Sequence, residues 1–250
     1  MTSAVPGVDP RPARRQARFQ TILAAAWDVA NEQGLAGVSL HEVARRVGLR
    51  QPSLYAYVDS KNGLYDAMFA QAAQALLEHM TTADYPQEPR PAVVIMARAM
   101  WGFVRENPAE GQLLFERTIP GFEPSSASYS VAQNFQSWVV DKLLAAGVAD
   151  PGDVDICTAL VAGLISAQET NEPGGDRWYR HLETVFGMFF AYLDNNSVTP
   201  TVGASTARHA THRAEPKVAP RPRSAPPIRK EGHHDRRDRP TGRGNTADRP

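Results

Sequence analysis

Residues Arg45–Tyr65 read RRVGLRQPSLYAYVDSKNGLY, and this stretch is helical in pattern but broken twice. Gly48 is the kind of residue that ends a helix, and Pro52 is tolerated only in the first turn of a new one. Ser60 can then cap a further helix that starts at Lys61. The stretch therefore predicts two short helices joined by a tight turn, the helix-turn-helix arrangement, followed by a longer helix.

The chain just before this stretch predicts another helix, over residues 13–33. Its apolar side chains recur at helical spacing and form one stripe: Phe19, Ile22, Leu23, Ala26 and Ala30. Gly34 is expected to end this helix. Ser39 and Glu42 have the spacing of a capping box, so the first helix of the helix-turn-helix should begin just after Ser39.

The remainder of the chain up to residue 196 also predicts helices and no strands. The expected ranges are 61–82, 90–106, 108–118, 127–146, 151–171 and 176–194. No stretch alternates between apolar and polar residues with a period of two, and no internal repeat is visible. The predicted fold class is all-α, with a three-helix helix-turn-helix head and a larger helical bundle.

Charge is distributed unevenly along the chain, although the formal net charge is zero. Residues 1–61 carry 8 Lys/Arg against 5 Asp/Glu, residues 62–200 carry 7 against 17, and residues 201–250 carry 12 against 5. An acidic middle repels DNA, so any contact with nucleic acid should come from the ends.

Both ends are expected to contain disordered segments, because they hold too few large apolar residues to form a core. We predict a basic leader over residues 1–12 and a basic, Pro/Arg-rich tail over residues 197–250. Four arginines at positions 11, 14, 15 and 18 could enter a minor groove as an arm or could simply belong to the leader. The tail could strengthen nonspecific DNA association or be a tolerated extension.

Several classes of protein are disfavoured. Cys157 is the only cysteine, so an intrachain disulfide and a multi-cysteine metal site are excluded. No apolar run reaches membrane-spanning length, and no signal peptide is evident, which favours a cytoplasmic, nucleoid-associated protein. No GxSxG, HExxH or phosphate-binding glycine loop is present. We therefore expect no catalytic residues, no cofactor and no metal.

Residues from roughly 15 to 75 resemble the N-terminal DNA-binding domain of the TetR family of bacterial transcriptional regulators. The resemblance lies in Ile22, Leu23, Ala26, Gly34, Val38-Ser39, Val43-Ala44, Val47-Gly48-Leu49, Leu54-Tyr55, Tyr57, Ser60-Lys61 and Leu64. It implies a DNA-binding domain over residues 13–75, with the helix-turn-helix at about 38–57, and a ligand-binding and dimerisation domain over residues 76–196. Arg50 and Val58 depart from the usual small polar residue and Phe, so the resemblance does not indicate the operator sequence.

The second helix of the helix-turn-helix carries groups suited to a major groove. Arg50 can bind guanine and Gln51 adenine, each through two hydrogen bonds. Tyr57, Ser53 and Lys61 are suited to phosphates, which fix the register of the protein on DNA. The predicted DNA-binding residues are Ser39, Arg45, Arg46, Arg50, Gln51, Pro52, Ser53, Tyr55, Ala56, Tyr57 and Lys61.

Some of these residues have a second interpretation. Arg45 and Arg46 could form a solvated helix face. Tyr55 could be a core aromatic that holds the turn, and Ser39 is first of all a helix cap.

Two apolar segments near residues 160 and 190 predict a homodimer. VFGMFFAYL (185–193) is apolar almost all round, and such a helix must be buried on every side. A four-helix interface with two helices from each subunit would bury it, and the resemblance implies the same arrangement. The alternative is an ordinary core helix. The predicted interface residues are Leu160, Val161, Leu164, Ile165, Val185, Phe186, Phe189, Phe190 and Leu193.

The resemblance also implies a pocket for a small-molecule effector. Candidate lining residues are Met96, Trp101, Phe103, Phe115, Phe122, Phe135, Trp138, Gln168, Glu169 and Asn171, although such residues are often only core. The predicted function is a ligand-responsive repressor that binds double-stranded DNA at a palindromic operator as a dimer. The alternatives are a DNA-binding regulator or nucleoid-type protein without small-molecule control and, remotely, a helical enzyme.

Overall fold

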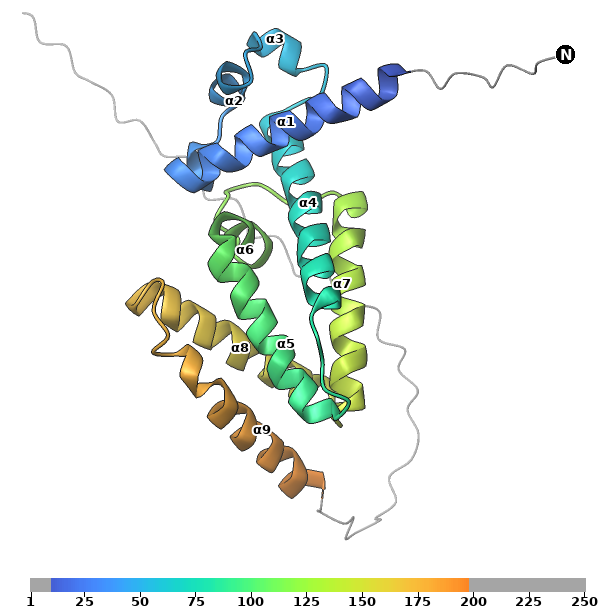
Figure 1. Ribbon diagram of the computed structural model, residues 1–250, viewed down its shortest axis with the longest axis vertical. Coiled ribbons are helices and arrows are strands. Elements are labelled where there is room, and N and C mark those ends of the chain that lie inside the picture. The colour runs from blue at the N-terminus through green and yellow to red at the C-terminus, as the bar shows by residue number, and fades with distance from the viewer. Residues whose placement is uncertain (1–9, 198–250) are drawn as a thin grey trace, which may run out of the picture. The chain divides into compact units, whose positions relative to one another are not determined.

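The computed structural model describes residues 10–197, and every regular element in that range is a helix (Figure 1). The α-helices are α1 (Pro10–Gln33), α2 (Leu40–Arg46), α3 (Gln51–Leu54), α4 (Lys61–Thr82), α5 (Pro89–Glu106), α6 (Pro108–Phe115), α7 (Ser126–Ala145), α8 (Pro151–Asn171) and α9 (Leu182–Ser197). Two short 3₁₀ helices, η1 (Leu35–Gly37) and η2 (Tyr179–His181), complete the set. The predicted all-α class is confirmed. None of the described helices is long and apolar enough to cross a membrane.

Local sequence signals account for the helix ends around the turn. The Ser39 hydroxyl accepts a hydrogen bond from the Glu42 N–H at 3.2 Å and caps α2. The Ser60 hydroxyl accepts one from the Gly63 N–H at 2.9 Å and caps α4. Gly48 follows α2 with a φ of 66°, in the left-handed region that glycine enters at little cost. The predicted caps and the predicted break at Gly48 are confirmed.

Four helix boundaries differ from the expected ones by three residues or more, and one of them is the end of α9, which lies at Ser197 rather than at residue 194. α1 begins at Pro10, so residues 10–12, expected to be disordered, are helical; prolines fit a first helical turn because their missing N–H would be unpaired there. α6 ends at Phe115 rather than at residue 118. α9 begins at Leu182 rather than at residue 176. The side-chain carbonyl of Gln168 accepts a hydrogen bond from the Trp178 N–H at 2.8 Å and holds the preceding segment as a loop. The rest of the leader, residues 1–9, and residues 198–250 of the tail lie outside the described range.

The buried apolar side chains form two clusters, and α4 belongs to both. The first cluster is formed by α1, η1, α2, α3 and α4, and it includes Ala109 and Leu113 from α6. The second takes Leu76 and Met80 from α4 and combines them with α5, α7, α8 and α9. Figure 1 shows α4 running from beneath α1 down along α7. α4 therefore connects the head, which carries the helix-turn-helix, to the bundle.

Two hydrogen bonds join α4 to the head. The Trp27 indole N–H of α1 donates to the side-chain carbonyl of Gln71 at 2.8 Å. The buried Tyr65 hydroxyl donates to the carbonyl of Leu35 at 2.6 Å. Because one partner in each pair is on α4, these bonds set the angle between α4 and the head.

Asp66 on α4 holds the start of α7. Its carboxylate accepts hydrogen bonds from the Ser125 N–H at 2.7 Å, the Ser125 hydroxyl at 2.8 Å and the Ser128 hydroxyl at 2.8 Å. Burial alone would raise the pKa of Asp66, but these hydrogen bonds outweigh it and lower the pKa below its ordinary value. The ionised carboxylate therefore anchors α7 to α4 at neutral pH.

Candidate nucleic-acid interface and ligand cavity

α3 presents a polar face at the end of the described structure away from α9 (Figure 1). Leu54 is fully buried and anchors this four-residue helix to the head core. Tyr55 is 50% exposed, so its interpretation as a core aromatic is not supported. Within the described part of the chain, the side chains of Arg50, Gln51 and Ser53 form no hydrogen bond or ion pair. These side chains and Tyr55 are therefore free to contact another molecule.

Two arginines of α1 donate hydrogen bonds to the segments on either side of α3. The Arg15 guanidinium donates to the carbonyl of Ala56 at 2.7 Å and lies 5.8 Å from the centre of the Tyr57 ring. The Arg18 guanidinium donates to the carbonyl of Val47 at 2.7 Å. Both arginines lie on a helix, so neither the flexible arm nor the disordered leader describes them. The sequence showed that these residues are basic, but it could not show that they lie beside the turn, because that position depends on the packing of α1 against the helix-turn-helix.

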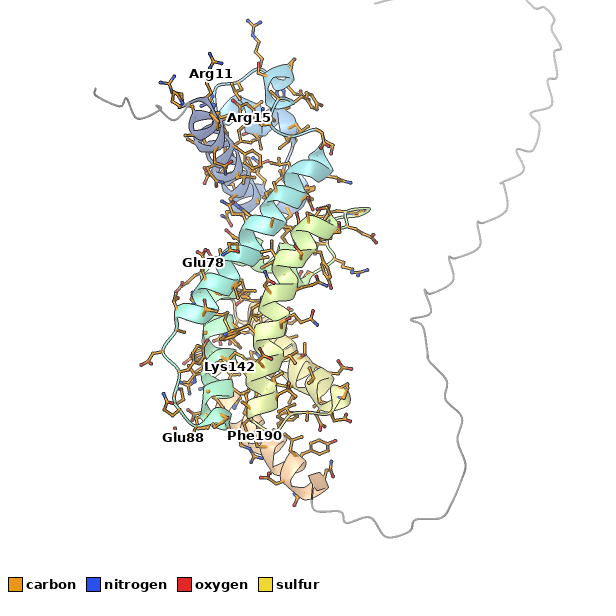
Figure 2. All side chains as sticks on the ribbon, turned by 90° about the vertical axis from the view of Figure 1, so that its right-hand side faces the viewer. Arg11, Arg15, Glu78, Glu88, Lys142 and Phe190 are labelled. Carbon is orange, nitrogen blue, oxygen red and sulfur yellow. The ribbon has the colours of Figure 1, made fainter. Side chains whose placement is uncertain are left out.

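An open hollow with a basic lining lies next to the end of α3. It measures about 410 Å³ and is lined by Arg11, Arg14, Arg15, Ala56 and Tyr57. Figure 2 shows Arg11 and Arg15 on the first helix, at the same end of the described structure as the helix-turn-helix. Arginine side chains at such an edge are suited to the phosphates that flank a major groove.

Arg46 serves as a clamp within the head. Its Nη1 donates to a Glu32 carboxylate oxygen of α1 at 2.8 Å, and its Nε donates to Glu42 of α2 at 3.0 Å. Arg45 Nε donates to the same Glu42 carboxylate at 2.8 Å. Hydrogen bonds from Arg45 and Arg46 lower the pKa of Glu42 to about 2.

Two expectations change as a result of these contacts. Glu42 was expected to reach back to the Ser39 N–H in a capping box, but its carboxylate is engaged by the arginines, so only the Ser39 half of the box is present. Arg46 was expected to contact DNA, but all of its guanidinium nitrogens have carboxylate partners. We correct its assignment to that of a residue that positions α2. Arg45 is more exposed and bonds only within its own helix.

The remaining predicted DNA contacts lie around α3 and at the start of α4. Ser39 is half-buried and caps α2, whereas Pro52 and Ala56 are exposed. Lys61 is exposed, opens α4, and has its ammonium 5.4 Å from the Tyr65 ring centre. It therefore lies beside the free N–H groups of the first turn of α4, a position that suits an anion.

A partly open cavity of about 910 Å³ lies in the bundle and reaches the end of α1. Its volume is in the range of small-molecule sites. Predicted pocket residues that line it are Met96, Phe115, Phe135 and Glu169. Lining residues that the sequence did not indicate include Asn31, Met100, Val104, Gln112, Glu116, Gln136 and Cys157.

The other predicted pocket residues lie outside the cavity, and we correct their assignment. They are Trp101, Phe103, Phe122, Trp138, Gln168 and Asn171. Trp101 and Phe103 are each 3% exposed and belong to the second core cluster. Gln168 holds the loop before η2, and the Asn171 amide donates to the carbonyl of Ala167 on its own helix. The side-chain amides of Gln168 and Asn171 are therefore engaged within the protein.

Cys157 lines the cavity, and burial raises the pKa of its thiol to about 11. Because the thiolate is the reactive form, only about 0.1% of the thiol is reactive at pH 8, against about a quarter of an ordinary one. We expect its alkylation rate by iodoacetamide to rise about tenfold per pH unit through pH 10, measured by mass spectrometry. In the urea-unfolded chain the alkylation rate should stop rising near pH 9. A rate that also stops rising near pH 9 in the folded protein would contradict the raised pKa of Cys157.

Several residues predicted for a dimer interface lie inside the subunit. Those on α9 are Phe186, Phe189, Phe190 and Leu193, all of them buried. They are covered by the chain itself because α9 packs on α5, where the Arg90 guanidinium donates to both carboxylate oxygens of Asp194 at 2.9 and 2.6 Å. On α8, Val161 and Ile165 line the cavity, as does Phe186. Leu160, Leu164 and Val185 are half-buried.

The apolar surface that remains exposed on α8 and α9 consists of other residues. Met188 is 62% exposed and Tyr192 43% exposed on α9, and Ile156 is 42% exposed on α8. Ala159 and Gly163 are also exposed on α8, with open space where a Gly163 side chain would lie. Small and apolar residues in this arrangement allow a second helix to approach closely. Among residues 10–197, no group of three His, Cys, Asp or Glu side chains is placed to hold a metal.

Comparison with known proteins agrees with this geometry. Residues 22–68 match the family described as bacterial regulatory proteins of the tetR family. The HTH-type transcriptional regulator Rv1816 of Mycobacterium tuberculosis is 30% identical over 181 residues, which is 66% of this chain and 75% of that protein. The class A tetracycline repressor of Escherichia coli is 36% identical over 67 residues, 27% of this chain and 29% of the repressor.

A solved structure has the same fold. A protein of unknown function from Rhodococcus sp. RHA1 superposes with a TM-score of 0.59 at 17% sequence identity, over 70% of this chain and 93% of that one. The helix-turn-helix head, the helical bundle and the extent of the similarity to Rv1816 lead to one conclusion. The chain belongs to the TetR family of bacterial regulatory proteins and is a transcriptional regulator with a helix-turn-helix.

Proposed function

We propose that this protein is a dimeric repressor that binds a palindromic operator through α3 and releases it when a small molecule occupies the bundle cavity. The observation that carries the proposal is the face of α3, where Arg50, Gln51, Ser53 and Tyr55 have no partner within residues 10–197. Guanidinium and amide groups in such a helix match the base edges of the major groove. From α1, Arg18 holds the turn before this helix at Val47, and Arg15 holds the segment after it at Ala56.

The proposal divides the chain into two working parts. Residues up to about 75 bind DNA, with Lys61, Tyr57 and Arg45 on the phosphates. Residues 76–196 form the dimer and supply most of the effector cavity, to which the end of α1 adds Ala30, Asn31 and Gly34. The protein acts in the cytoplasm on chromosomal DNA and performs no catalysis of its own. Blocking a promoter requires no further contacts, so repression needs only the DNA-bound dimer.

Selection from random duplexes tests the proposed DNA binding. The purified full chain should enrich a short inverted repeat, and footprinting on that sequence should protect one discrete dyad. Half-sites should be centred about 34–36 Å apart, because two heads on one face of DNA meet successive major grooves. Enrichment of no sequence, or protection without a boundary, would contradict sequence-specific regulation and favour a nucleoid-type binder.

We propose that α8 and α9 of two subunits form the dimer interface through their exposed faces. Met188 and Tyr192 of α9 would pack against the small surface around Ala159 and Gly163 of α8. This differs from the residues expected from the sequence, most of which are occupied within the subunit. Pairing two heads raises operator affinity because binding of the first half-site brings the second to a high effective concentration.

Replacement of Met188 by Glu tests this interface. Sedimentation equilibrium should show a dimer for the unchanged protein and a shift of the dimer dissociation constant by at least about 100-fold, since a carboxylate would be buried without a partner. The matched control is Leu144→Glu on α7, where the leucine is 49% exposed and lies outside the proposed interface. A Met188→Glu protein that stays as dimeric as the control would contradict the interface.

α6 offers a route from the cavity to the head. Leu113 belongs to the head core, Gln112 and Phe115 line the cavity, and Ala109 does both. A ligand that prefers a shifted position of α6 lowers DNA affinity by its differential binding to the two states. The same helix is thus part of both the DNA-binding core and the ligand site.

A further inference from the structure

We propose that the cavity binds an amphiphilic organic cation, with its apolar body inside the bundle and its positive group beside Glu116 and Glu169. This inference rests on the proposed function, because it names the class of effector for the same cavity. It is carried by the charge of the lining, by the helix ends at the cavity and by the apolar interior.

The charged residues of the lining are all acidic. Among the described residues that line the cavity there is no Lys, Arg or His, whereas Glu116 and Glu169 are both present. Neither carboxylate forms a hydrogen bond or ion pair with any residue in the range 10–197. By contrast, other bundle carboxylates such as Glu183 and Asp194 are paired with arginines. Arg117 follows Glu116 in the chain but does not line the cavity.

The ends of three helices add negative potential to this region. α1 ends near Asn31 and Gly34, α6 ends at Phe115 just before Glu116, and Glu169 lies in the last turn of α8. Helix C-termini carry partial negative charge from carbonyls without partners. Figure 1 shows the three ends on the same side of the described structure. A positive group here meets two free carboxylates and three favourable dipoles.

The interior of the cavity suits an apolar body. Met96, Met100, Phe135, Val139 and Phe186 supply thioether, aromatic and aliphatic surface. The neutral polar residues of the lining, which can orient a ligand, are Asn31, Gln112, Gln136, Thr158, Ser166 and Thr170. An anionic amphiphile of the same size would find no cation in this lining and would place its charge beside the half-buried Glu169 and the exposed Glu116, and like charges repel. The apolar interior of the cavity therefore accepts many amphiphiles, and its negative charge favours the cationic ones.

The charge of the whole bundle has the same sign as the site. Residues 62–200 contain 7 Lys/Arg and 17 Asp/Glu. Such an excess raises the local concentration of cations around the protein and disfavours the approach of anions. A cationic effector is therefore favoured both on its way to the cavity and inside it.

Fluorescence titration of the full-length protein with three probes tests the inference. The probes are rhodamine 6G, a lipophilic cation; Nile red, which is neutral; and 11-(dansylamino)undecanoic acid, which is anionic. We expect rhodamine 6G to bind at least about tenfold more tightly than the anionic probe. The double variant Glu116→Gln/Glu169→Gln should lose about tenfold in rhodamine 6G affinity and change Nile red affinity less than twofold, because only the cation interacts with the two charges.

The matched control removes the same charge elsewhere. Glu78→Gln/Glu88→Gln changes two exposed carboxylates on α4 and before α5, which do not line the cavity (Figure 2). This control should keep its rhodamine 6G affinity within about twofold, because these carboxylates lie outside the cavity and salt largely screens charges at a distance from the ligand. An equal loss in the control variant, or no loss in the cavity variant, overturns the proposal. Preference for the anionic probe overturns it as well.

Operator binding is measured separately on the same preparations. A protein that binds its selected duplex but shows no preference for the cation overturns the effector class and leaves the regulator intact. A protein that shows the expected cation preference but selects no duplex supports the ligand class of the cavity and contradicts the proposed function. The two failures are therefore distinguishable.

Discussion

Replacement of Arg50 and Gln51 together by alanine is expected to weaken binding to the selected operator by two to three orders of magnitude. Each side chain can form two hydrogen bonds with a base, and one such contact contributes about 1–3 kcal/mol of discrimination. Losing both contacts at one half-site corresponds to about 2–6 kcal/mol, and the middle of that range, about 4 kcal/mol, is about 1,000-fold in affinity. Fluorescence anisotropy with a labelled duplex, at one fixed salt concentration, measures the change.

The same substitution should leave the fold intact, because neither side chain has a partner within residues 10–197. The thermal midpoint, followed by circular dichroism, is expected to stay within about 2 °C of the unchanged protein. Arg105→Ala/Gln87→Ala, which alters two exposed residues at the bundle, is the matched control for operator affinity. Operator affinity that falls no further than in this control would rule out α3 as the reading helix.

Leu54→Ala is expected to lower the free energy of unfolding by about 3 kcal/mol, within the range for leucine truncation in a closed core. Leu54 is fully buried and is the one buried side chain of the four-residue α3. α3 is too short to be stable without tertiary packing, so its position depends on this contact. Operator affinity should therefore fall as well, even at temperatures where the bundle stays folded.

Urea unfolding followed by circular dichroism measures the loss of stability. Ser53→Ala is the control, since Ser53 neighbours Leu54 but is exposed, and it should change the free energy of unfolding by less than about 0.5 kcal/mol. A Leu54→Ala protein as stable as this control would mean that α3 is held by other contacts. The core role of Leu54 in the head would then be wrong.

The helix-turn-helix was predictable because its signals are local. Ser39, Gly48 and Ser60 act on backbone groups within a few residues of themselves, so their effect on helix ends does not depend on the rest of the fold. The role of Arg46 was not predictable in this way. Its partner Glu32 is 14 residues away on another helix, and only the packing of α1 against α2 brings the two together.

The bundle was harder to predict, because an apolar side chain has the same pattern in a core, a cavity wall or an interface. Trp101 was predicted to line the cavity and is core, whereas its neighbour Met100 lines the cavity. One residue corresponds to a rotation of about 100° around the helix, so sequence spacing alone cannot assign these positions without knowing where the neighbouring helices lie. The apolar residues of α9 raised the same difficulty. Phe186 was predicted for the dimer interface, but it is buried within the subunit in the core cluster that α9 forms with α5.

The contribution of α1 to the cavity wall limits how far this regulator can be treated as a set of interchangeable modules. Ala30, Asn31 and Gly34 line the cavity, and Glu32 between them holds Arg46 of α2. A chimaera that takes its DNA-binding head from a relative would import a foreign piece of the ligand site along with the new operator preference. Biosensors built from this scaffold should therefore retain the last turn of α1 and exchange only the residues that face the duplex.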